Sequence, residues 1–399
     1  MVVPILLGGD LNCYSMALAF YEAGIHRSVA LGRYRLGATS FSRFARQVID
    51  RDMDSDEGKR RAILRVMSMY PGCRPILLGC TDEYASFLIR ERESFDKDVI
   101  IPSPPRHALA YADKSVFGEE CVRRGICAPR TVVLGEGAAV PYVIPFLYPA
   151  VLKPAVSEEY WRHPFSGMRK VWFPNSREEA ESILLRMRAA GYSGAVLLQE
   201  RLPIKDTDNY VLSVYSDRTG RARAAAYGRV LLEEHTPKGL GNHAAILTMP
   251  PPPIAKKLMA FLDEIGYSGF SNFDLIMHPH TGELYVLEMN LRQGRSNHYM
   301  TAAGLNPAGL VLSDLLYREA LPFSVAIPDV LWHSVPLSVV YSQVTEGVLC
   351  DRLRKLAARG RAVSPFHARA DLYRNPLRRM FVLEHERRVR KRSAEPLKG

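Results

Sequence analysis

Short apolar segments alternate with helical patterns over the first hundred or so residues, and this alternation restricts the fold more than any other feature. Four runs are apolar and short enough to be buried strands: 2–7, 28–31, 75–78 and 98–101. Helical patterns separate them: 13–22 with Asn12 as its cap, 59–70, and a third that Thr81 or Asp82 caps and that runs to Arg92. Strands joined by helices pair in parallel, so the sequence predicts a Rossmann-like α/β domain whose sheet is covered by helices.

Two turns at the carboxyl ends of these strands are candidates for ligand binding. Ligands of parallel sheets bind beyond this edge, close to the beginnings of helices. The turns are Gly8-Gly9-Asp10, followed by Asn12, and Gly79-Cys80-Thr81-Asp82. Tight turn geometry alone also accounts for such glycines. The G-x-G-x-x-G fingerprint is absent, which counts against a dinucleotide-binding dehydrogenase.

A hairpin pattern between residues 270 and 290 carries three oxygen donors. An apolar run at 270–276 contains Asp274, turn residues follow at 279–282, and 283–290 runs back with Glu288 and Asn290. Residues two apart in a strand project from the same face. Carboxylate oxygens suit Mg²⁺, which proteins hold with one or two acids together with substrate phosphates. The alternative is a surface hairpin with ordinary exposed acids.

The order of these acids resembles the metal-binding signature of the ATP-grasp superfamily, an acid on one strand and E-x-N-x-R on the next. Here the residues are Asp274 and Glu288-Met-Asn290-Leu-Arg292. Lys114 at a helix start and Lys153 at the end of the apolar run 150–152 resemble the family's two phosphate-binding lysines. Residues 157–170 replace its glycine-rich loop but contain one glycine, Gly167. Three residues there are candidates for phosphate contacts: Ser166, Arg169 and Lys170.

The resemblance, which covers about residues 114–316, implies a reaction and a set of site residues. ATP is held between two α+β lobes, its γ-phosphoryl group passes to a carboxylate, and an amine then attacks the acyl phosphate. Asp274, Glu288 and Asn290 are expected to hold Mg²⁺, as two ions, and Arg292 and Lys153 are the expected catalytic residues. The remaining nucleotide contacts are expected from Lys114, from Glu200 and Leu202 at the adenine, and from Asp206 or Asp208, with Asp208 preferred, at the ribose.

A narrower resemblance covers the chain from its start to about residue 320. The segments PILLGGDLN, GCTDEYA, LLEEHTP with GN, and NLRQGRSN are similar to those of the bacterial D-aspartate ligases of cell-wall synthesis. This resemblance implies amide formation between the β-carboxylate of D-aspartate and the side-chain amine of the diamino acid in the peptidoglycan stem peptide. Four residues are candidates for substrate contacts: Asp10, Asn12, Arg295 and Ser296. A helix starting within 293–297 is expected to offer free N–H groups there.

We therefore expect a mixed α/β and α+β chain in three parts. These are a Rossmann-like domain at 1–112, a two-lobe ATP-grasp domain at 113–320, and a C-terminal extension with a basic tail at 321–399. Other expected elements are a hairpin at 209–227, a loop at 238–243 that either closes over substrate or simply connects two strands, and helices at 255–265 and 347–359.

The net charge of +11 is concentrated in the tail. Residues 351–399 contain 15 Lys/Arg and 5 Asp/Glu, so the preceding part is nearly neutral. A basic run such as 387–392 attracts anionic surfaces, including a membrane-linked precursor, although a solvated terminus explains it equally well. The neutral remainder and the lack of a recognition fold count against a specific nucleic-acid partner.

The cysteines and the absence of long apolar runs favour a cytoplasmic protein. The six cysteines show no C-x-x-C spacing and are typical of buried thiols in a reducing compartment. No run has the length of a membrane span, and the N-terminus lacks the basic region of a signal peptide.

Two functional alternatives remain open: a ligase of the same mechanism for another acid and amine, and a non-catalytic nucleotide-binding protein. The intact set of Asp274, Glu288 and Asn290 counts against the second.

Overall fold

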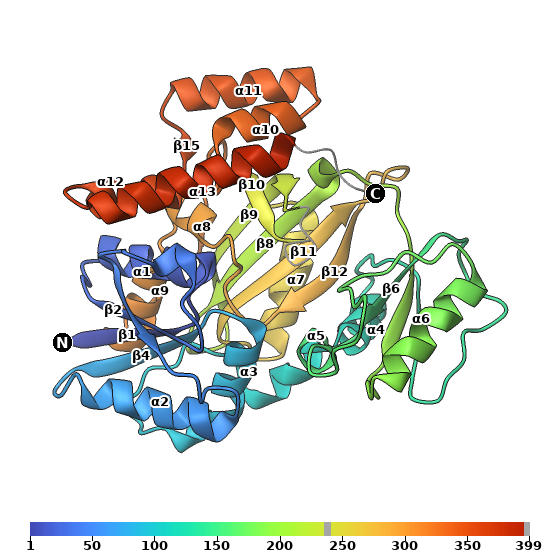
Figure 1. Ribbon diagram of the computed structural model, residues 1–399, viewed down its shortest axis with the longest axis horizontal. Helices are drawn as coiled ribbons and strands as arrows, with labels where there is room; N and C mark the ends of the chain where they lie inside the picture. The colour runs from blue at the N-terminus through green and yellow to red at the C-terminus, as the bar shows by residue number, and fades with distance from the viewer. Residues whose placement is uncertain (235–240, 395–399) are drawn as a thin grey trace.

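The computed structural model describes residues 1–234 and 241–394, which form three sheets and their covering helices (Figure 1). The first sheet is parallel, with strand order β3-β2-β1-β4. Its strands are β1 (Val2–Leu7), β2 (Ser28–Gly32), β3 (Ala45–Ile49) and β4 (Arg74–Gly79). Its helices are α1 (Leu11–Glu22), α2 (Asp56–Ser68) and α3 (Asp82–Glu91). The predicted parallel N-terminal sheet is thus confirmed.

Three details of the sequence prediction for this region are wrong. Strand β3 was not anticipated, because its residues Ala45–Ile49 are only partly apolar. Residues 98–101 form no strand; Ile100 makes a single bridge to Ile76. Helix α1 begins one residue before Asn12, and Asp10 is its cap, accepting from the backbone N of Cys13 at 3.2 Å. For α3, the capping side chain is Thr81.

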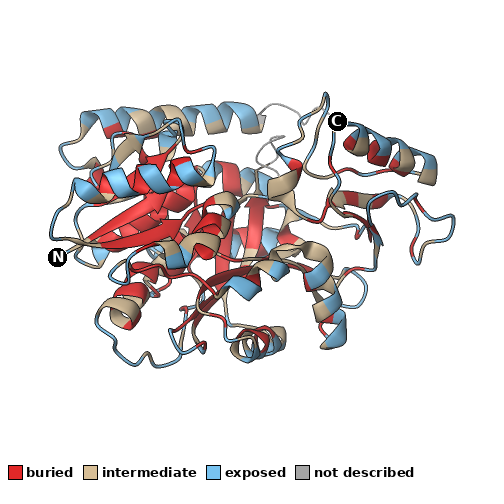
Figure 2. Ribbon diagram, turned by 90° about the horizontal axis from the view of Figure 1, so that it is seen from below, coloured by how far each residue is buried: buried red, intermediate tan, exposed pale blue. Residues whose placement is uncertain are grey.

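Helix α1 is buried on all sides. Residues 11–20 are all buried, because the sheet covers one face of the helix and later segments of the chain cover the others. Helix α9 (Pro307–Val311) packs against it, and Tyr14 contacts Phe366 from the C-terminal region. The two ends of the chain therefore share one core, visible as the dense red region in Figure 2.

The second sheet is small and antiparallel, with order β5-β7-β6. Its strands are β5 (Thr131–Leu134), β6 (Ala150–Pro154) and β7 (Val196–Glu200), and α6 (Arg177–Ala189) covers it. Between the first and second sheets lie a 3₁₀ helix, η3 (Arg106–Ala112), and α4 (Lys114–Arg123). A one-turn helix, α5 (Ser157–Tyr160), follows β6.

The third sheet has eight strands and occupies the middle of the molecule (Figure 1). Its path is β12-β11-β8-β9-β10-β14-β15, and β13 pairs with β9. The strands are β8 (Asn209–Ser216), β9 (Ala222–Glu233), β10 (His243–Met249), β11 (Gly269–Met277), β12 (Leu284–Asn290), β13 (Ser324–Val325), β14 (Leu331–His333) and β15 (Ala362–Val363). Helix α7 (Pro253–Glu264) packs on one face, and α8 (His298–Ala302), α9 and a π-helical turn (Leu312–Leu316) lie on the other.

Alternation along the strands decides which side chains enter which core. On β8, Tyr210, Leu212 and Val214 pack towards α7, whereas Val211 and Tyr215 pack towards α1 and α9. Both faces of this sheet are therefore covered. The hairpins predicted at 209–227 and 270–290 are both confirmed, as β8–β9 and β11–β12.

The last part of the chain is mostly helical. It contains α10 (Leu337–Gln343), α11 (Gly347–Ala358), a 3₁₀ turn (Pro365–His367), α12 (Arg369–Leu372) and α13 (Pro376–Ala394). The basic run at 387–392 is part of α13, which crosses the molecule beside α12 (Figure 1). Within the described residues, no helix is both long and apolar enough to cross a membrane.

Candidate active site

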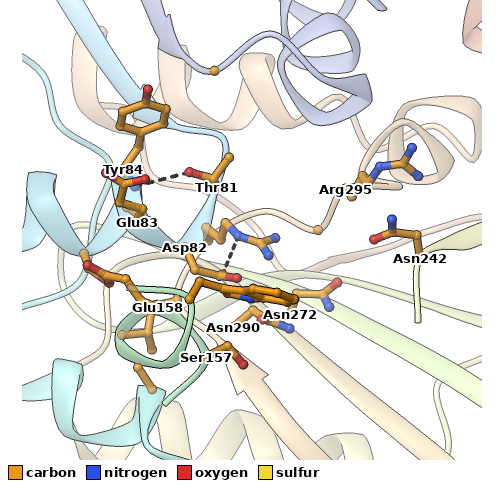
Figure 3. Close-up of a pocket in the computed structure, with 18 of the residues that line it drawn as sticks. Thr81, Asp82, Glu83, Tyr84, Ser157, Glu158, Asn242, Asn272, Asn290 and Arg295 are labelled. Carbon is orange, nitrogen blue, oxygen red and sulfur yellow. Dashed lines mark hydrogen bonds and ion pairs between the residues drawn. The ribbon is translucent and has the colours of Figure 1, made fainter. Parts of the chain in front are cut away.

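A cleft of about 900 Å³ opens between the first and third sheets, beside the segment that follows β6 of the second sheet. The first sheet contributes the turns after its strands, including Gly8 and Asp82. Lys114 begins α4, Ser157 begins α5, and the β11–β12 hairpin with residues 291–296 forms the remaining wall. Figure 3 shows Asp82, Asn272 and Asn290 together with Ser157 and Glu158, and Arg295 and Asn242 to their right.

The β11–β12 hairpin brings its two acids face to face. Asp274 pairs directly with Glu288, and Asn272 with Asn290, just before a bulge that follows Asp274. The amide nitrogens of Asn290 and Asn272 each donate to Asp274, at 3.3 Å. Sequence reasoning missed Asn272, although its position two residues before Asp274 places it on the same face of β11.

Lys114 and Glu288 form an ion pair across the cleft wall, with 3.0 Å between Nζ and Oε2. Burial opposes the charge on Lys114, but Glu288, Asp82 and Asp274 outweigh it and raise the pKa of the amine. Burial likewise opposes the charge on Glu288, yet Lys114, Lys170 and Lys153 together hold the pKa of its carboxyl well below the usual range. Glu288 is therefore ionised at neutral pH.

Positive charge accumulates on this side of the cleft. Burial lowers the pKa of Lys153 to about 8, and Lys114 and Lys170 act in the same direction. Lys170 lines the cleft; the other two candidates from its segment, Ser166 and Arg169, are exposed and are not among the lining residues that the structure describes. Three lysines gathered around one carboxylate are suited to binding an additional anion.

Asp274 and Glu288 are suited to a divalent cation whose remaining coordination positions are filled by a bound substrate and water. Burial raises the pKa of Asp274 well above its usual value, and the adjacent Glu288 raises it further. A cation between the two carboxylates would relieve this repulsion. Within residues 1–234 and 241–394, no cluster of three His, Cys, Asp or Glu side chains forms a complete cage. Two carboxylates and an amide oxygen match Mg²⁺ completed by phosphates and water.

Two arginines follow the hairpin, and each is held by an acid from another segment. Arg292 Nε lies 2.7 Å from Asp82 Oδ1. Arg295 Nη2 lies 2.8 Å from Glu234 Oε1, and its Nη1 is buried without a hydrogen-bond partner among the described residues. Ser296 also lines the cleft.

The segment expected to start a helix here is instead a tight turn. Asn297 N donates to Gly294 O at 3.0 Å and Tyr299 N to Ser296 O at 2.9 Å, and α8 begins only at His298. The prediction of a helix beginning within 293–297 was therefore wrong. The chain has too few residues before Gly304 to form more than a short helix.

Asp10 and Asn12 lie at the end of β1 but differ in their contacts. Burial raises the pKa of Asp10, and Arg295 and Arg292 are near enough to oppose that rise. The Asn12 amide donates to Cys80 O at 2.9 Å and to Gln293 O at 3.1 Å, and its Oδ1 accepts from Asn297 at 2.9 Å. Asn12 thus joins the two turns of the first sheet to the loop after β12.

The predicted adenosine contacts lie apart from this cleft. The Glu200 carboxylate pairs with Arg130, with Oε1 2.5 Å from Nη2. Asp208 accepts from the backbone N of Lys205 at 2.9 Å, and Leu202 is largely buried. None of these three, nor Lys153, is among the described residues that line the cleft.

The loop predicted at 238–243 lies partly outside the described residues, as do residues 235–237 of the LLEEHTP segment. Its last three residues, Gly241 to His243, line the cleft. His243 Nε2 lies 4.0 Å from Asp274 Oδ1. Burial, with Arg295 and Lys170, lowers the pKa of His243 to about 4, so the imidazole is neutral at pH 7. From the sequence, His243 was expected only to belong to the loop at 238–243, and its proximity to Asp274 was not predicted.

Known proteins resemble this chain in sequence and in fold. No protein-family model matches the chain. A curated relative, D-aspartate ligase of Enterococcus faecium (strain Aus0004), is 32% identical over 325 residues, which cover 79% of this chain and 77% of the relative.

Solved structures resemble the chain at much lower identity. An L-amino acid ligase from Bacillus licheniformis has a TM-score of 0.54 at 14% identity, covering 79% of this chain and 74% of that one. N5-carboxyaminoimidazole synthetase from Staphylococcus aureus, complexed with ADP, has a TM-score of 0.57 at 15% identity, covering 81% and 79%. These likenesses concern the fold. Together with the 32% identical relative, they show that the chain belongs to the D-aspartate ligase family, a group of ATP-grasp ligases that join a carboxylate to an amine.

Proposed function

We propose that this enzyme joins the β-carboxylate of D-aspartate to the side-chain amine of the diamino acid in the peptidoglycan stem peptide. The observation that carries the proposal is the cleft that Asp274 and Glu288 share with two lysines and two arginines, while a third lysine, Lys153, also acts on the Glu288 carboxyl. The 32% identical D-aspartate ligase supports the choice of substrate. ATP is the phosphoryl donor, and ADP and phosphate are released.

In this proposal the lysines bind the phosphates of ATP. Lys114 and Lys153 neutralise the phosphate oxygens, and Lys170 adds a third positive charge beside Glu288. Asp274, Glu288 and Asn290 hold Mg²⁺, as two ions, which would neutralise charge on the phosphates. Phosphoryl transfer between anions depends on such positioning and positive charge more than on proton transfer.

The nucleoside occupies the region beside the second sheet. Glu200 and the backbone at Leu202 bind adenine, and Asp208 binds the ribose. Because the Glu200 carboxylate is paired with Arg130, adenine would share that carboxylate with the guanidinium.

The reaction has two steps, each of which forms one bond and breaks another. A carboxylate oxygen of the donor attacks the γ-phosphorus, and the bond to the leaving ADP oxygen breaks. The acceptor amine then attacks the acyl carbon, and the carbon–oxygen bond to phosphate breaks as the amine loses its proton. Arg292, directed by Asp82, stabilises the charge on the transferring group and on the tetrahedral intermediate.

The donor amino acid binds beside the turns of the first sheet. Arg295 and Ser296 bind its α-carboxylate, and Asp10 its α-ammonium group. Asn12, whose amide is bonded to protein groups, contributes by positioning the 293–297 loop. The reaction takes place in the cytoplasm, and the basic tail contacts the membrane-linked precursor.

We also propose that residues 1–112, 113–320 and 321–399 are the units of the chain. The third unit contributes β13, β14 and β15 to the large sheet.

The test is ADP release from Mg-ATP with D- and L-amino acids as donors, with and without a lysine-containing stem peptide. Release is expected only with D-aspartate and the peptide, and is expected to disappear in Glu288→Gln. Glu283→Gln, at the exposed turn of the same hairpin, is the matched control. Release with another pair would change the substrate and retain the chemistry. Tight ATP binding without turnover for any pair would refute a catalytic function.

A further inference from the structure

Helix α13 is held firmly against the rest of the fold by a buried ion pair. Arg378 and Asp371 are both fully buried, with 2.8 Å between Nε and Oδ2. Asp371 also accepts from the Tyr14 hydroxyl at 2.9 Å, and Arg378 donates to Ser40 O at 2.9 Å. The helix is therefore a preformed surface element.

The inner and outer faces of α13 separate cleanly by helical spacing. Four inward residues, at i, i+4, i+7 and i+11, are buried or half-buried: Arg378, Val382, His385 and Val389. The outward face begins with three large apolar side chains, Leu377, Met380 and Leu383, which are 55%, 66% and 66% exposed. The outer face of the first half of the helix thus exposes three large apolar side chains beside Arg379, whereas ordinary surface helices present mainly polar residues to solvent.

Two exposed aromatic side chains lie beside the start of α13. Phe41 is 49% exposed, and its carbonyl accepts from the Asn375 side chain at 2.8 Å. Tyr373, 52% exposed, precedes the helix by three residues. We call Phe41, Tyr373, Leu377, Met380 and Leu383 the apolar patch. Several large apolar side chains exposed together on one surface commonly mark an interaction site.

Strong positive charge follows the apolar patch along the same helix. Five exposed basic residues occupy its last turns: Arg387, Arg388, Arg390, Lys391 and Arg392. Glu384 and Glu386 pair with some of them, at 2.7 Å to Arg388 Nε and 2.9 Å to Arg390 Nη2, so a net positive charge remains. The partner of this surface must therefore offer both apolar and anionic groups.

We propose that the outer face of α13 is a docking surface for an anionic lipid bilayer. An interfacial helix places apolar side chains among the acyl chains while its basic residues meet the lipid headgroups. A nucleic acid would bind only the basic residues and would leave the apolar patch exposed to water. His385, on the inner face, has its pKa lowered by burial, and Glu234 and Arg295 are near enough to influence it. The proposal concerns binding and does not depend on which amino acid the enzyme uses.

The experiment measures sedimentation of the full-length protein with vesicles. Binding is expected to vesicles of phosphatidylglycerol and phosphatidylcholine and not to phosphatidylcholine alone. Leu377→Asn with Met380→Asn and Leu383→Asn should lower the partition coefficient about tenfold or more, since partly buried apolar contacts are lost. Arg387→Gln with Arg388→Gln, Arg390→Gln and Lys391→Gln should lower it on the order of a hundredfold.

A matched control replaces three exposed apolar residues on other helices by asparagine. These are Leu64 on α2, Val122 on α4 and Leu185 on α6, which are 47%, 72% and 60% exposed. This control is expected to bind vesicles like the unaltered protein, and ADP release with free substrates should be unchanged in this control and in the variant of Leu377, Met380 and Leu383. The proposal is overturned if the protein binds neither vesicle, if the control loses binding as the α13 variants do, or if only heparin retains the protein.

Discussion

At the scale of single residues, the positive charges of three lysines oppose the negative charges of two carboxylates in and around the cleft. Glu288 interacts with both sets of charges, because it is buried and faces both Asp274 and the lysines. Without the lysines, two adjacent carboxylates could not both remain ionised in a buried position. The same lysines that we propose bind phosphate therefore keep Glu288 charged, whereas burial beside Glu288 raises the pKa of Asp274.

Replacing Lys114 by methionine should reduce ADP formation by about 10²–10³-fold, the usual effect of removing one preorganised charge from a phosphoryl- or acyl-transfer site. The side-chain volume is nearly kept, and Lys153 and Lys170 still act on Glu288, so the chain should stay folded although it loses the stability of the ion pair. Steady-state ADP release measures the effect, with Lys256→Met on the exposed side of α7 as control. An unchanged rate would mean that Lys114 serves only to pair with Glu288.

His298 gives the chain a pH-dependent stability. Burial lowers its pKa to about 4 in the folded protein, against 6.5 in an unfolded chain. The contribution of the neutral imidazole to the free energy of unfolding is therefore complete above pH 6.5. It is lost as the pH falls towards 4, because His298 binds a proton in the unfolded chain but not in the folded protein. The loss is roughly 3 kcal/mol.

Urea unfolding between pH 7 and pH 4.5 measures this dependence. In His298→Gln the free energy of unfolding should fall less over this range than in the unaltered protein. His280→Gln, in the exposed hairpin turn, should leave the dependence unchanged. Equal pH dependence in all three proteins would contradict the assignment.

At the scale of elements, the first sheet presents its ligand-facing turns through close contacts with its helices. Gly79 ends β4, and a Cβ placed on it would lie 2.4 Å from the backbone N of Ala85 in α3. Only glycine allows the helix to approach the strand this closely. The position of Asp82, and with it Arg292, depends on that approach.

Gly79→Ala should destabilise the protein by about 1–3 kcal/mol, as overpacking against backbone generally does. Gly118→Ala in α4 is the opposite case, because a Cβ there meets nothing within 4 Å. That change should stabilise by about 1 kcal/mol, the helix propensity of alanine over glycine. Urea unfolding of both variants tests the pair. If both substitutions changed the free energy of unfolding in the same direction, the close approach of helix and strand would not be the reason for glycine at position 79.

The junction between α12 and α13 should behave as a buried ion pair. Replacing only one partner, as in Asp371→Asn or Arg378→Met, leaves the other uncompensated and should cost roughly 3–5 kcal/mol. Replacing both should cost less than the sum of the two. A double-mutant cycle by chemical denaturation measures the coupling. Additive losses would mean that Asp371 acts mainly through its bonds to Tyr14 and Arg43.

At the scale of the whole molecule, the cleft is lined by the first and third sheets and by the segment that follows β6 of the second, so a ligand there should stabilise the entire chain. At a hundred times its Kd, MgADP should add about 2.7 kcal/mol to the free energy of unfolding. Thermal unfolding with MgADP, compared with ADP and a chelator, measures the gain. The gain should shrink in Glu288→Gln and persist in Glu283→Gln. A full gain in Glu288→Gln would place the metal elsewhere.

The sequence was sufficient for features that depend on local spacing. The period of two placed Glu288 and Asn290 on one face of β12, and the alternation of strands and helices predicted the parallel sheet. It was insufficient where partners are distant along the chain. Glu200 meets Arg130 seventy residues away, and Arg378 is buried because Asp371 and Tyr14 surround it, although its basic neighbours suggested a solvated tail. The sequence predicted Asn12 as a helix cap, whereas in the structure its amide donates to the backbone oxygens of Cys80 and Gln293.

The burial of α1 on every side also has a consequence for synthesis of the chain. Domains generally fold as they leave the ribosome, beginning from the N-terminus. Here Tyr14 is covered by Phe366 and Arg378, which are translated long after it. Until those residues have been made, the first helix has an apolar face with no partner. The nascent chain should therefore depend on chaperones until residues 366–378 emerge, and a chain terminated before residue 366 should be insoluble.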